Sequence, residues 1–464
     1  MVVIPGIGGS VLETASGVAV WGPGLGGLAG ALVDPARLSL AEHPRLRPVA
    51  LLGSTRILPW TVVPGYDGLL RQVANEFSLS ADDIDVARED VPPKPGASVV
   101  LFPYDFRVGV AAAAERLDAE VTRRLVDRPT EGQRVVIVAH SMGGLVVRYW
   151  LGPLRGARYC RALITLGTPH RGAPKALEWL LNGVRVGPAP VAALSSTLLA
   201  EAAEVLREWP STYELLPRYR AVRDDESGSE HYPHELGPAW FTKQAQASFD
   251  RHREIETAWG ALESAQRPEV LALFARGHAT PSRAVRHGDR VRVTKVDAEW
   301  LPNVGWRGDG TVPALSAIPI ELSEDVRARR AVPDRHGPMA TCPAAVEALR
   351  DYEAEPFGSL RGDSPARPWL GLDLDEVLAA GEPFTVTAEL LGTADIEGAT
   401  AWLHVTPDGH PAAAAPLRMT GGEGRWEVTV PGLAPGSYRI GVEAVNVPRV
   451  DRVRGGDVVG VIEP

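Results

Sequence analysis

One segment, Val135–Gly144, constrains the fold of this chain more than any other. Its first four residues are β-branched and predict a buried strand, and the apolar run after residue 144 predicts a helix. Between them, Ala-His-Ser-Met-Gly-Gly places Ser141 in a turn so sharp that only small neighbours avoid the backbone. Ala139 stands where the usual pattern has glycine. The pattern is typical of a nucleophile elbow, which projects a serine hydroxyl above the edge of a sheet.

A nucleophilic serine needs a base and an acid that orients it, and after an elbow they follow in the order acid, then histidine. Gly308-Asp309-Gly310 places an acid between two glycines, and His336 is the next histidine along the chain. Taken alone, each has an ordinary explanation, an Asp-Gly turn and a solvated loop histidine. Their order behind a complete elbow predicts that Ser141, Asp309 and His336 form a catalytic triad.

The start of the chain predicts an oxyanion hole. Val2–Ile4 reads as a short buried strand, and the glycine-rich loop Pro5–Ser10 follows it. Backbone N–H groups in such a loop can face the negative charge that develops on a carbonyl oxygen under attack. We expect the N–H groups of Ile7 and Met142 to be the donors, the second because it follows the nucleophile. A plain glycine turn is the alternative.

Six motifs occur in a fixed order over about residues 1–350. They are Pro5–Ser10, Pro103–Arg107, Ala139–Gly144, Leu166–Gly172, Pro210–Pro217 and Gly308–Pro313. Together they resemble the lecithin:cholesterol acyltransferase family of α/β-hydrolases, which includes phospholipid acyltransferases and phospholipases of the A type. The resemblance implies an acyl-enzyme on Ser141, with Asp309 and His336 as its partners, and leaves the acyl acceptor open. Phe106 stands where the family commonly has Trp.

The coarse pattern of the chain agrees with an α/β-hydrolase domain over residues 1–360. A helix with one apolar face is expected at Val110–Val126, between two apolar strands. The expected strands are Ser98–Phe102, Arg134–Val138, Ala162–Leu166 and Val270–Phe274. Alternation of this kind predicts a mostly parallel sheet with helices on both faces and the catalytic loops at its carboxyl edge.

Residues 174–265 do not continue this alternation, because their pattern is helical and rich in apolar side chains. These are Trp179, Leu180, Leu181, Leu198, Leu199, Val205, Leu206, Trp209, Trp240 and Phe241. We interpret the segment as a lid over Ser141 that forms an acyl-chain tunnel, with Trp179 and Trp209 binding substrate. Helices that simply pack around the sheet are the alternative. The polar stretch 223–230 predicts a mobile loop.

After a Pro-rich linker at 361–370, the apolar pattern changes to a period of two. Short alternating strands separated by Pro-Gly turns predict an all-β immunoglobulin-like sandwich over 371–464. Every candidate catalytic residue precedes this domain. We therefore expect a chain shortened after about residue 360 to remain a soluble enzyme that cleaves small esters.

The composition of the chain limits the kinds of molecule that it is expected to bind. The net charge of −10 argues against nucleic acid. Cys160 and Cys342 are expected to be two buried thiols rather than a disulfide. We expect no cofactor and no metal: the glycine pattern at 22–27 lacks a flanking strand and helix, and a proline separates His231 from His234. No export signal precedes the first strand, which predicts a cytoplasmic protein.

We therefore expect a serine esterase or lipase that cleaves acyl esters, of phospholipids or other lipids, with acyl transfer to an alcohol left open. The sequence also leaves room for transient contact with a membrane surface and for a protein partner of the sandwich. The alternative is a catalytically idle hydrolase fold that recruits partners through its C-terminal domain. Labelling of Ser141 by a fluorophosphonate distinguishes the two.

Overall fold

The structure, a computed structural model, describes most of the chain. The described residues are 1–23, 31, 34–53, 55–56, 62–63, 65–126, 134–183, 201–288, 290–297, 305–354, 368–375, 377–393, 395–407, 415–448 and 450–462. Most of the expected linker and residues 24–27 of the glycine pattern lie outside these ranges, as do Leu198 and Leu199 of the expected lid. We call residues 1–354 the α/β domain and residues 368–462 the sandwich.

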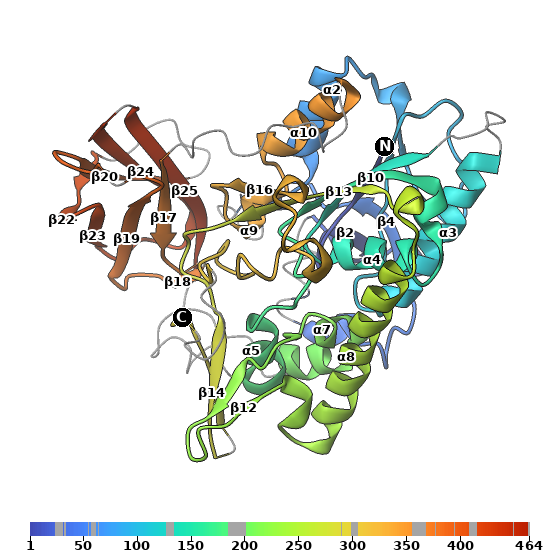
Figure 1. Ribbon diagram of the computed structural model, residues 1–464, viewed down its shortest axis with the longest axis horizontal. Helices are drawn as coiled ribbons and strands as arrows, with labels where there is room; N and C mark the ends of the chain where they lie inside the picture. Colours follow the sequence, from blue (N-terminus) through green and yellow to red (C-terminus); the bar gives the residue numbers. More distant parts are fainter. Residues whose placement is uncertain are drawn as a thin grey trace.

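A seven-stranded sheet forms the centre of the α/β domain, in the order β16-β13-β10-β9-β1-β8-β7 (Figure 1). Each pair of neighbouring strands is parallel. The strands are β1 Val2–Ile4, β7 Ile84–Val86, β8 Val99–Leu101, β9 Val135–His140, β10 Cys160–Leu166, β13 Glu269–Ala275 and β16 Arg329–Val332. The mostly parallel sheet expected from the sequence is confirmed, and with the helices below it makes an α/β-hydrolase fold.

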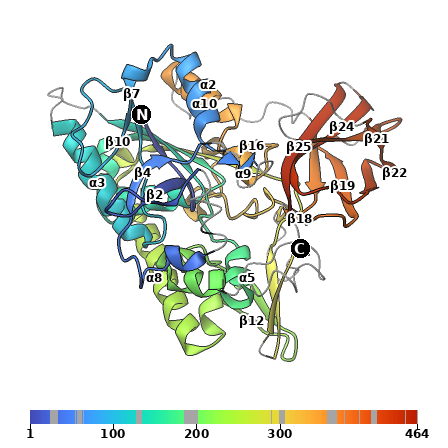
Figure 2. The ribbon, with the colours of Figure 1, turned by 180° about the vertical axis from the view of Figure 1, so that it is seen from behind.

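Helices cover both faces of this sheet, which explains why its strands are almost continuously apolar. One face carries α3 (Val110–Val126) and α4 (Met142–Leu151), and the other carries α2 (Asp67–Glu76) and α10 (Pro343–Ala354). Figures 1 and 2 show α2 and α10 side by side. All ten residues of α4 are buried, because α3 and α8 cover the sides of this helix that the sheet does not.

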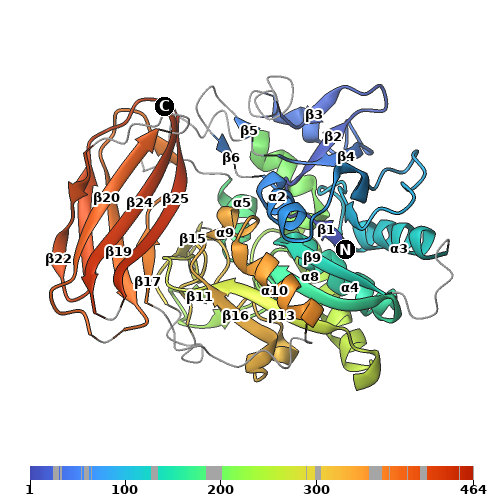
Figure 3. The same cartoon turned by 90° about the horizontal axis from the view of Figure 1, so that it is seen from above.

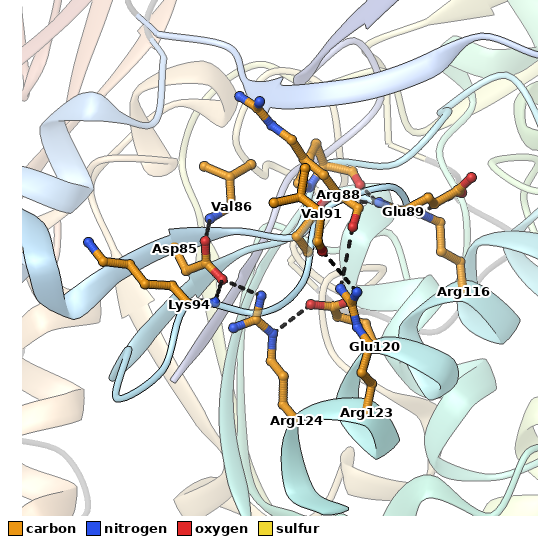
Figure 4. Close-up of polar contacts among 12 residues, drawn as sticks. Asp85, Val86, Arg88, Glu89, Val91, Lys94, Arg116, Glu120, Arg123 and Arg124 are labelled. Atoms are coloured by element: carbon orange, nitrogen blue, oxygen red, sulfur yellow. Dashed lines mark hydrogen bonds and ion pairs between the residues drawn. The ribbon is translucent and has the colours of Figure 1, made fainter. Parts of the chain in front are cut away.

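An ion-pair network fixes α3 to the β7 edge of the sheet (Figure 4). The guanidinium of Arg124 lies 2.7 Å from Asp85 on β7 and 2.5 Å from Glu120 on its own helix. Arg116, two turns earlier on α3, pairs with Glu89 at 3.0 Å. Arg124 and Glu120 are mostly buried, so these contacts are less screened than surface pairs. They hold the helix against β7, which is the edge strand of this sheet among the described strands.

The expected lid is only partly helical. Its helices are α5 (Lys175–Asn182), a segment at 201–208, α7 (Pro210–Tyr213) and α8 (Ala239–Gly260). A four-stranded sheet accompanies them, in the order β12-β11-β14-β15. Its strands are β11 Val222–Asp224, β12 Glu230–His231, β14 Arg283–His287 and β15 Arg290–Thr294. The expectation of a helical segment was wrong here. β11 and β12 are too short to show a period, β11 takes its register from β14, some 60 residues later, and β12 pairs with β11.

The polar stretch at 223–230 is a hairpin turn between β11 and β12 rather than an irregular loop. The carboxylate of Asp224 accepts hydrogen bonds from the N–H groups of Glu226 and Ser227 and from the Ser227 hydroxyl. A short carboxylate that bonds the backbone just ahead of it is a common way to close such a turn. The stretch expected to be a mobile loop is thus a turn that the carboxylate of Asp224 closes.

Two smaller sheets lie near the start of the chain. One joins β2 (Ser10–Glu13) to β3 (Ala19–Trp21) and β4 (Arg47–Leu51), and the other pairs β5 (Thr55–Arg56) with β6 (Val62–Val63). Cys160 and Cys342 are both free and buried, as expected. Within the described ranges, no helix is long and apolar enough to cross a bilayer.

The C-terminal residues form two sheets that share one apolar core. One sheet has the order β17-β19-β23-β22 and the other the order β18-β25-β24-β20-β21. The strands are β17 Trp369–Asp373, β18 Val377–Ala379, β19 Phe384–Leu391, β20 Thr400–Pro407, β21 Leu417–Arg418, β22 Thr420–Gly422, β23 Arg425–Val430, β24 Gly436–Val447 and β25 Asp451–Ile462. The all-β domain is confirmed, and its immunoglobulin-like class stays a prediction.

The sandwich lies beside one end of the α/β domain (Figures 1 and 3). Strands β17 and β25 occupy the side of the sandwich that faces α9 (His336–Met339), a short helix that follows β16. The boundary between the two domains therefore lies next to α9, whose first residue is His336.

Candidate active site

Ser141 occupies a strained turn between β9 and α4. Its φ of 50° and ψ of −128° fall where non-glycine residues are rare, which is the conformation expected of an elbow. The glycines beside it are needed for close approach: a Cβ on Gly143 would lie 2.4 Å from the carbonyl oxygen of Pro5, and one on Gly144 would lie 2.0 Å from Oγ1 of Thr168. The local sequence is thus dictated by how tightly the turn packs against β1 and the loop after β10.

The structure brings the three expected triad residues together, although they come from three separate segments of the chain. Nε2 of His336 lies 2.9 Å from Oγ of Ser141, and Nδ1 of the same ring lies 2.7 Å from Oδ2 of Asp309. The backbone N–H of His336 also donates to the carbonyl of Asp309 at 3.0 Å. A serine, a histidine and a buried acid in this order are arranged for proton transfer away from the hydroxyl.

Asp309 is held as a carboxylate although it is almost fully buried. Burial alone acts to raise its pKa. The neighbouring His336 and the hydrogen bonds from the N–H groups of Thr311 and Val312, at 2.9 and 2.6 Å, outweigh burial and lower the pKa below its usual range. The acid that faces the His336 ring is therefore charged at neutral pH.

The Pro5–Ser10 loop lies directly over the serine. A Cβ on Gly6 would lie 2.8 Å from Cβ of Ser141, so only glycine allows this approach. Within the described residues, the N–H of Gly6 is taken by Tyr66 and that of Gly9 by the carbonyl of Gly6, whereas no bond uses the N–H of Ile7. Met142 is the first residue of α4, where an N–H has no acceptor within the helix. Met142 thus directly follows the serine and Ile7 directly follows Gly6, and their role as oxyanion donors stays a prediction.

Tyr66 and His140 also belong to the site, and the sequence analysis assigned a role to neither. The phenol oxygen of Tyr66 accepts the N–H of Gly6 at 2.8 Å and lies 2.9 Å from Nδ1 of His140. Nε2 of His140 lies 3.0 Å from the carbonyl oxygen of His336. This chain of contacts joins the Pro5–Ser10 loop above Ser141 to the backbone of His336.

The direction of every bond in this chain is fixed. Burial lowers the pKa of His140 to about 3, so the ring is neutral and carries one proton. A carbonyl only accepts, so Nε2 of His140 holds that proton and donates it to the carbonyl of His336. Nδ1 is then an acceptor, and the hydroxyl of Tyr66 donates to it. His140 comes from the elbow motif itself, whereas no sequence signal marked Tyr66.

An aromatic row, Trp21–Phe106–Trp209, runs beside the loop. Ring centroids lie 5.7 Å apart for Trp21 and Phe106 and 5.6 Å apart for Phe106 and Trp209, both in edge-to-face contact. The indole of Trp21 donates to the carbonyl of Gly8, and that of Trp209 donates to the carbonyl of Leu38. Trp209 is 5% exposed and so belongs to the packed interior.

Trp179 takes part in neither of these two ring contacts. Trp179 lies on α5 at the edge of the core, with the ammonium of Lys175 5.9 Å from its ring centroid. Both tryptophans pack against the apolar core, as the alternative interpretation of the lid expects. A substrate-binding role for Trp179 and Trp209 stays a prediction. Among the described residues, no group of three or more metal-ligating side chains is arranged to hold an ion.

Sequence comparisons relate the middle of the chain to lipid-modifying enzymes. Residues 93–247 match the family model "Lecithin:cholesterol acyltransferase". A phospholipase A(1) of Arabidopsis thaliana, LCAT3, is 30% identical over 129 residues, which are 26% of this chain and 28% of that protein. The chain thus aligns with little more than a quarter of this curated relative.

Among solved structures, a lipase from Bacillus licheniformis in its propeptide form covers 98% of this chain and 92% of its own, with 10% identity and a TM-score of 0.33. A TM-score this low carries no argument, so the fold rests on the strand order described above. The segment that matches the family model contains Ser141 and ends before Asp309 and His336.

Proposed function

We propose that this protein is a serine enzyme that cleaves acyl esters of lipids and passes the acyl group to water or to an alcohol. The observation that carries the proposal is the line of contacts from Ser141 through His336 to Asp309, at 2.9 and 2.7 Å. The match of residues 93–247 to an acyltransferase family and the likeness to a phospholipase support a lipid substrate.

In the first step, Oγ of Ser141 attacks the ester carbonyl carbon and its proton moves to Nε2 of His336. Asp309, ionised and bonded to Nδ1, stabilises the imidazolium without taking a proton. When the bond to the leaving alcohol breaks, Nε2 returns the proton to the departing oxygen. The acyl group is then esterified to Ser141, and His336 is neutral again.

The carbonyl oxygen becomes negatively charged during this attack. The proposed donors to this oxygen are the N–H groups of Ile7, in the Pro5–Ser10 loop, and of Met142, in the first turn of α4. Donors that are already fixed toward the developing charge lose no energy to reorientation during the reaction, and one such donor contributes roughly 3 to 4 kcal/mol in other enzymes.

The second step repeats the first with a new nucleophile. Water or an alcohol gives its proton to Nε2 of His336 and attacks the acyl carbon, and Ser141 leaves with the proton that the ring returns. Water yields a fatty acid, whereas an alcohol yields a new ester. The proposed default is hydrolysis, because water is present at high concentration wherever the site is open.

The test is mass spectrometry of phosphatidylcholine vesicles incubated with the full chain. We expect lysophospholipid and free fatty acid in equal amounts, and new esters when a long-chain alcohol is added to the bilayer. Ser141→Ala should lower the rate by about 10⁴- to 10⁶-fold, as for other triads whose members act together.

A fluorophosphonate that labels wild type and not Ser141→Ala reports on the serine independently of the lipid. Labelling without phospholipid cleavage would keep the esterase and reject the phospholipid as substrate. A folded wild type that is neither labelled nor active would reject the enzyme altogether and favour the idle, partner-recruiting fold.

A further inference from the structure

The residue before His336 reaches out of the α/β domain into the sandwich. Arg335 is 3% exposed, and its Nε lies 2.6 Å from Oδ2 of Asp457, which is 6% exposed on β25. Nη2 of the same guanidinium donates to the carbonyl of Leu374, between β17 and β18, at 3.4 Å. One buried arginine, in the position before α9, thus contacts a strand of one sheet and the connection between the two sheets of the sandwich.

Arg335 also lies against the turn that carries the acid. A Cβ on Gly310 would lie 2.7 Å from Nη2 of Arg335, so the guanidinium packs on the residue that follows Asp309. Gly310 has a φ of 94°, and its N–H donates to the hydroxyl of Thr280 at 2.9 Å. The guanidinium therefore sits between the acid turn and the sandwich, one residue from His336.

A second side chain, His278, makes the same connection. Its Nδ1 accepts the backbone N–H of Leu372 on β17 at 3.1 Å, and its Nε2 donates to the carbonyl of Pro333 at 2.9 Å. Its own backbone N–H donates to the carbonyl of Gly308 at 3.1 Å. His278 thus joins the sandwich, the residue before Asp309 and the loop that leads to His336.

The two domains approach each other closely enough to exclude water here. A Cβ on Gly371 of β17 would lie 2.3 Å from the carbonyl oxygen of Gly277, and the N–H of Ala279 donates to the carbonyl of Leu372 at 3.3 Å. Contact at this distance ties the backbones together. By contrast, the ion pair of Lys295 with Asp373 at the same boundary is 39% and 45% exposed.

A buried ion pair is weak as a source of stability, because desolvation of both charges offsets their attraction. What it supplies is a fixed arrangement of the groups that carry it. Here those groups are the neighbours of Asp309 and His336. We propose that the sandwich is a positioning part of the active site, with Asp457 acting through Arg335 to hold the base and the acid in register. This inference rests on the proposed ester-cleaving function.

These contacts argue against the expectation that the α/β domain cleaves small esters without the sandwich. All candidate catalytic residues do precede residue 361, but the loops that carry two of them are held from the sandwich side. A chain shortened after about residue 360 would lose Asp457, Leu372 and Leu374 together. The activity on small soluble esters, expected from sequence to survive that deletion, should therefore fall with it.

The test uses the full chain and a short-chain nitrophenyl ester, with three variants. Asp457→Asn removes the ion pair and leaves the Arg335 charge buried. Arg335→Met/Asp457→Leu removes both charges, which should restore stability without restoring the tether. Asp373→Asn removes an exposed ion pair at the same boundary and is the matched control.

We expect Asp457→Asn and the double variant each to lower kcat by about 10- to 100-fold, the size of effect that displacement by about 1 Å can have, with KM within about twofold of wild type. Fluorophosphonate labelling should slow in parallel. The thermal midpoint should fall for Asp457→Asn and recover in the double variant, and Asp373→Asn should match wild type in every measurement.

A double variant in which kcat recovers together with the midpoint would overturn the inference, because the ion pair would then act on stability alone. So would an Asp457→Asn variant with the kcat of wild type. Failure of the proposed function looks different: wild type itself would neither cleave the ester nor react with the probe.

Discussion

The phenol oxygen of Tyr66 and Nδ1 of His140 lie 2.9 Å apart, in a buried contact that links the two halves of the site. Tyr66→Phe removes the acceptor of the Gly6 N–H and the donor to His140. We expect kcat on a short-chain ester to fall by about 10-fold, because about 1 to 3 kcal/mol of hydrogen bonding is lost next to the loop over Ser141. Steady-state kinetics measures the effect.

Tyr219→Phe is the control for this change, since the hydroxyl of Tyr219 also makes a hydrogen bond with the main chain, to the carbonyl of Ser282 at 2.9 Å. It should lose a similar amount of stability and keep its kcat. If the two variants lose equal activity, Tyr66 contributes only to the packing of the fold.

Replacement of the acid tests the triad in a second way. Asp309→Asn should lower kcat by about 10⁴-fold, because an amide facing Nδ1 favours the wrong tautomer of His336. Asp105→Asn is the comparison: Asp105 is bonded to Arg107 at 2.7 Å, and the expected loss is of stability. An inactive Asp105→Asn beside a nearly normal Asp309→Asn in the same esterase assay would mean that the wrong acid has been identified.

The parts of this site that could be predicted are those that a local pattern encodes. The elbow needs a strand, a serine and small residues within ten positions, and all of them are visible between Val135 and Gly144. Asp309 and His336 follow from chain order. His140 stands inside the elbow motif, so its contact with the backbone of His336 could have been sought there, since a histidine beside the nucleophile is necessarily buried near the base.

The parts that could not be predicted depend on contacts between distant segments. Tyr66 meets Gly6 across 60 residues, and no motif surrounds it. Arg335 meets Asp457 across two domains, and an arginine before a loop histidine looks like an ordinary solvated residue. β11 is three residues long and is a strand because β12 and β14 lie on its two sides. In each case the partner, rather than the local sequence, determines the structure.

The aromatic row offers a test of the lid. Trp209→Ala removes a buried indole, which should cost about 3 to 5 kcal/mol of unfolding free energy. If Trp209 also borders the acyl chain, the variant should lose more activity on long-chain esters than on acetyl esters, measured at a temperature where it is folded. Equal losses at every chain length would leave Trp209 as a packing residue. Trp179→Ala, at the edge of the core, should cost less stability.

Buried histidines should make the fold sensitive to acid. Burial lowers the pKa of His252 to about 4, from an ordinary value of 6.5, and its Nε2 donates to the carbonyl of Glu214 at 2.8 Å. Between these two values the unfolded chain binds a proton that the folded protein does not. The stabilising contribution is therefore complete above pH 6.5 and is lost as the pH falls toward 4.

The expected loss from His252 is about 2 kcal/mol between pH 7.5 and pH 5, because 1.5 pH units below the unfolded pKa correspond to about 1.4 kcal/mol each. Burial raises the pKa of Glu214 to about 7, so this residue makes the fold more stable as the pH falls, which is the opposite effect. Because wild type and both variants contain Glu214, its effect cancels in the comparison. Urea unfolding at the two pH values should therefore show a smaller loss of unfolding free energy for His252→Gln than for wild type. His287→Gln, which replaces an exposed histidine, is the control and should lose as much as wild type. Equal losses in wild type and His252→Gln would mean that His252 accepts its proton in the folded protein.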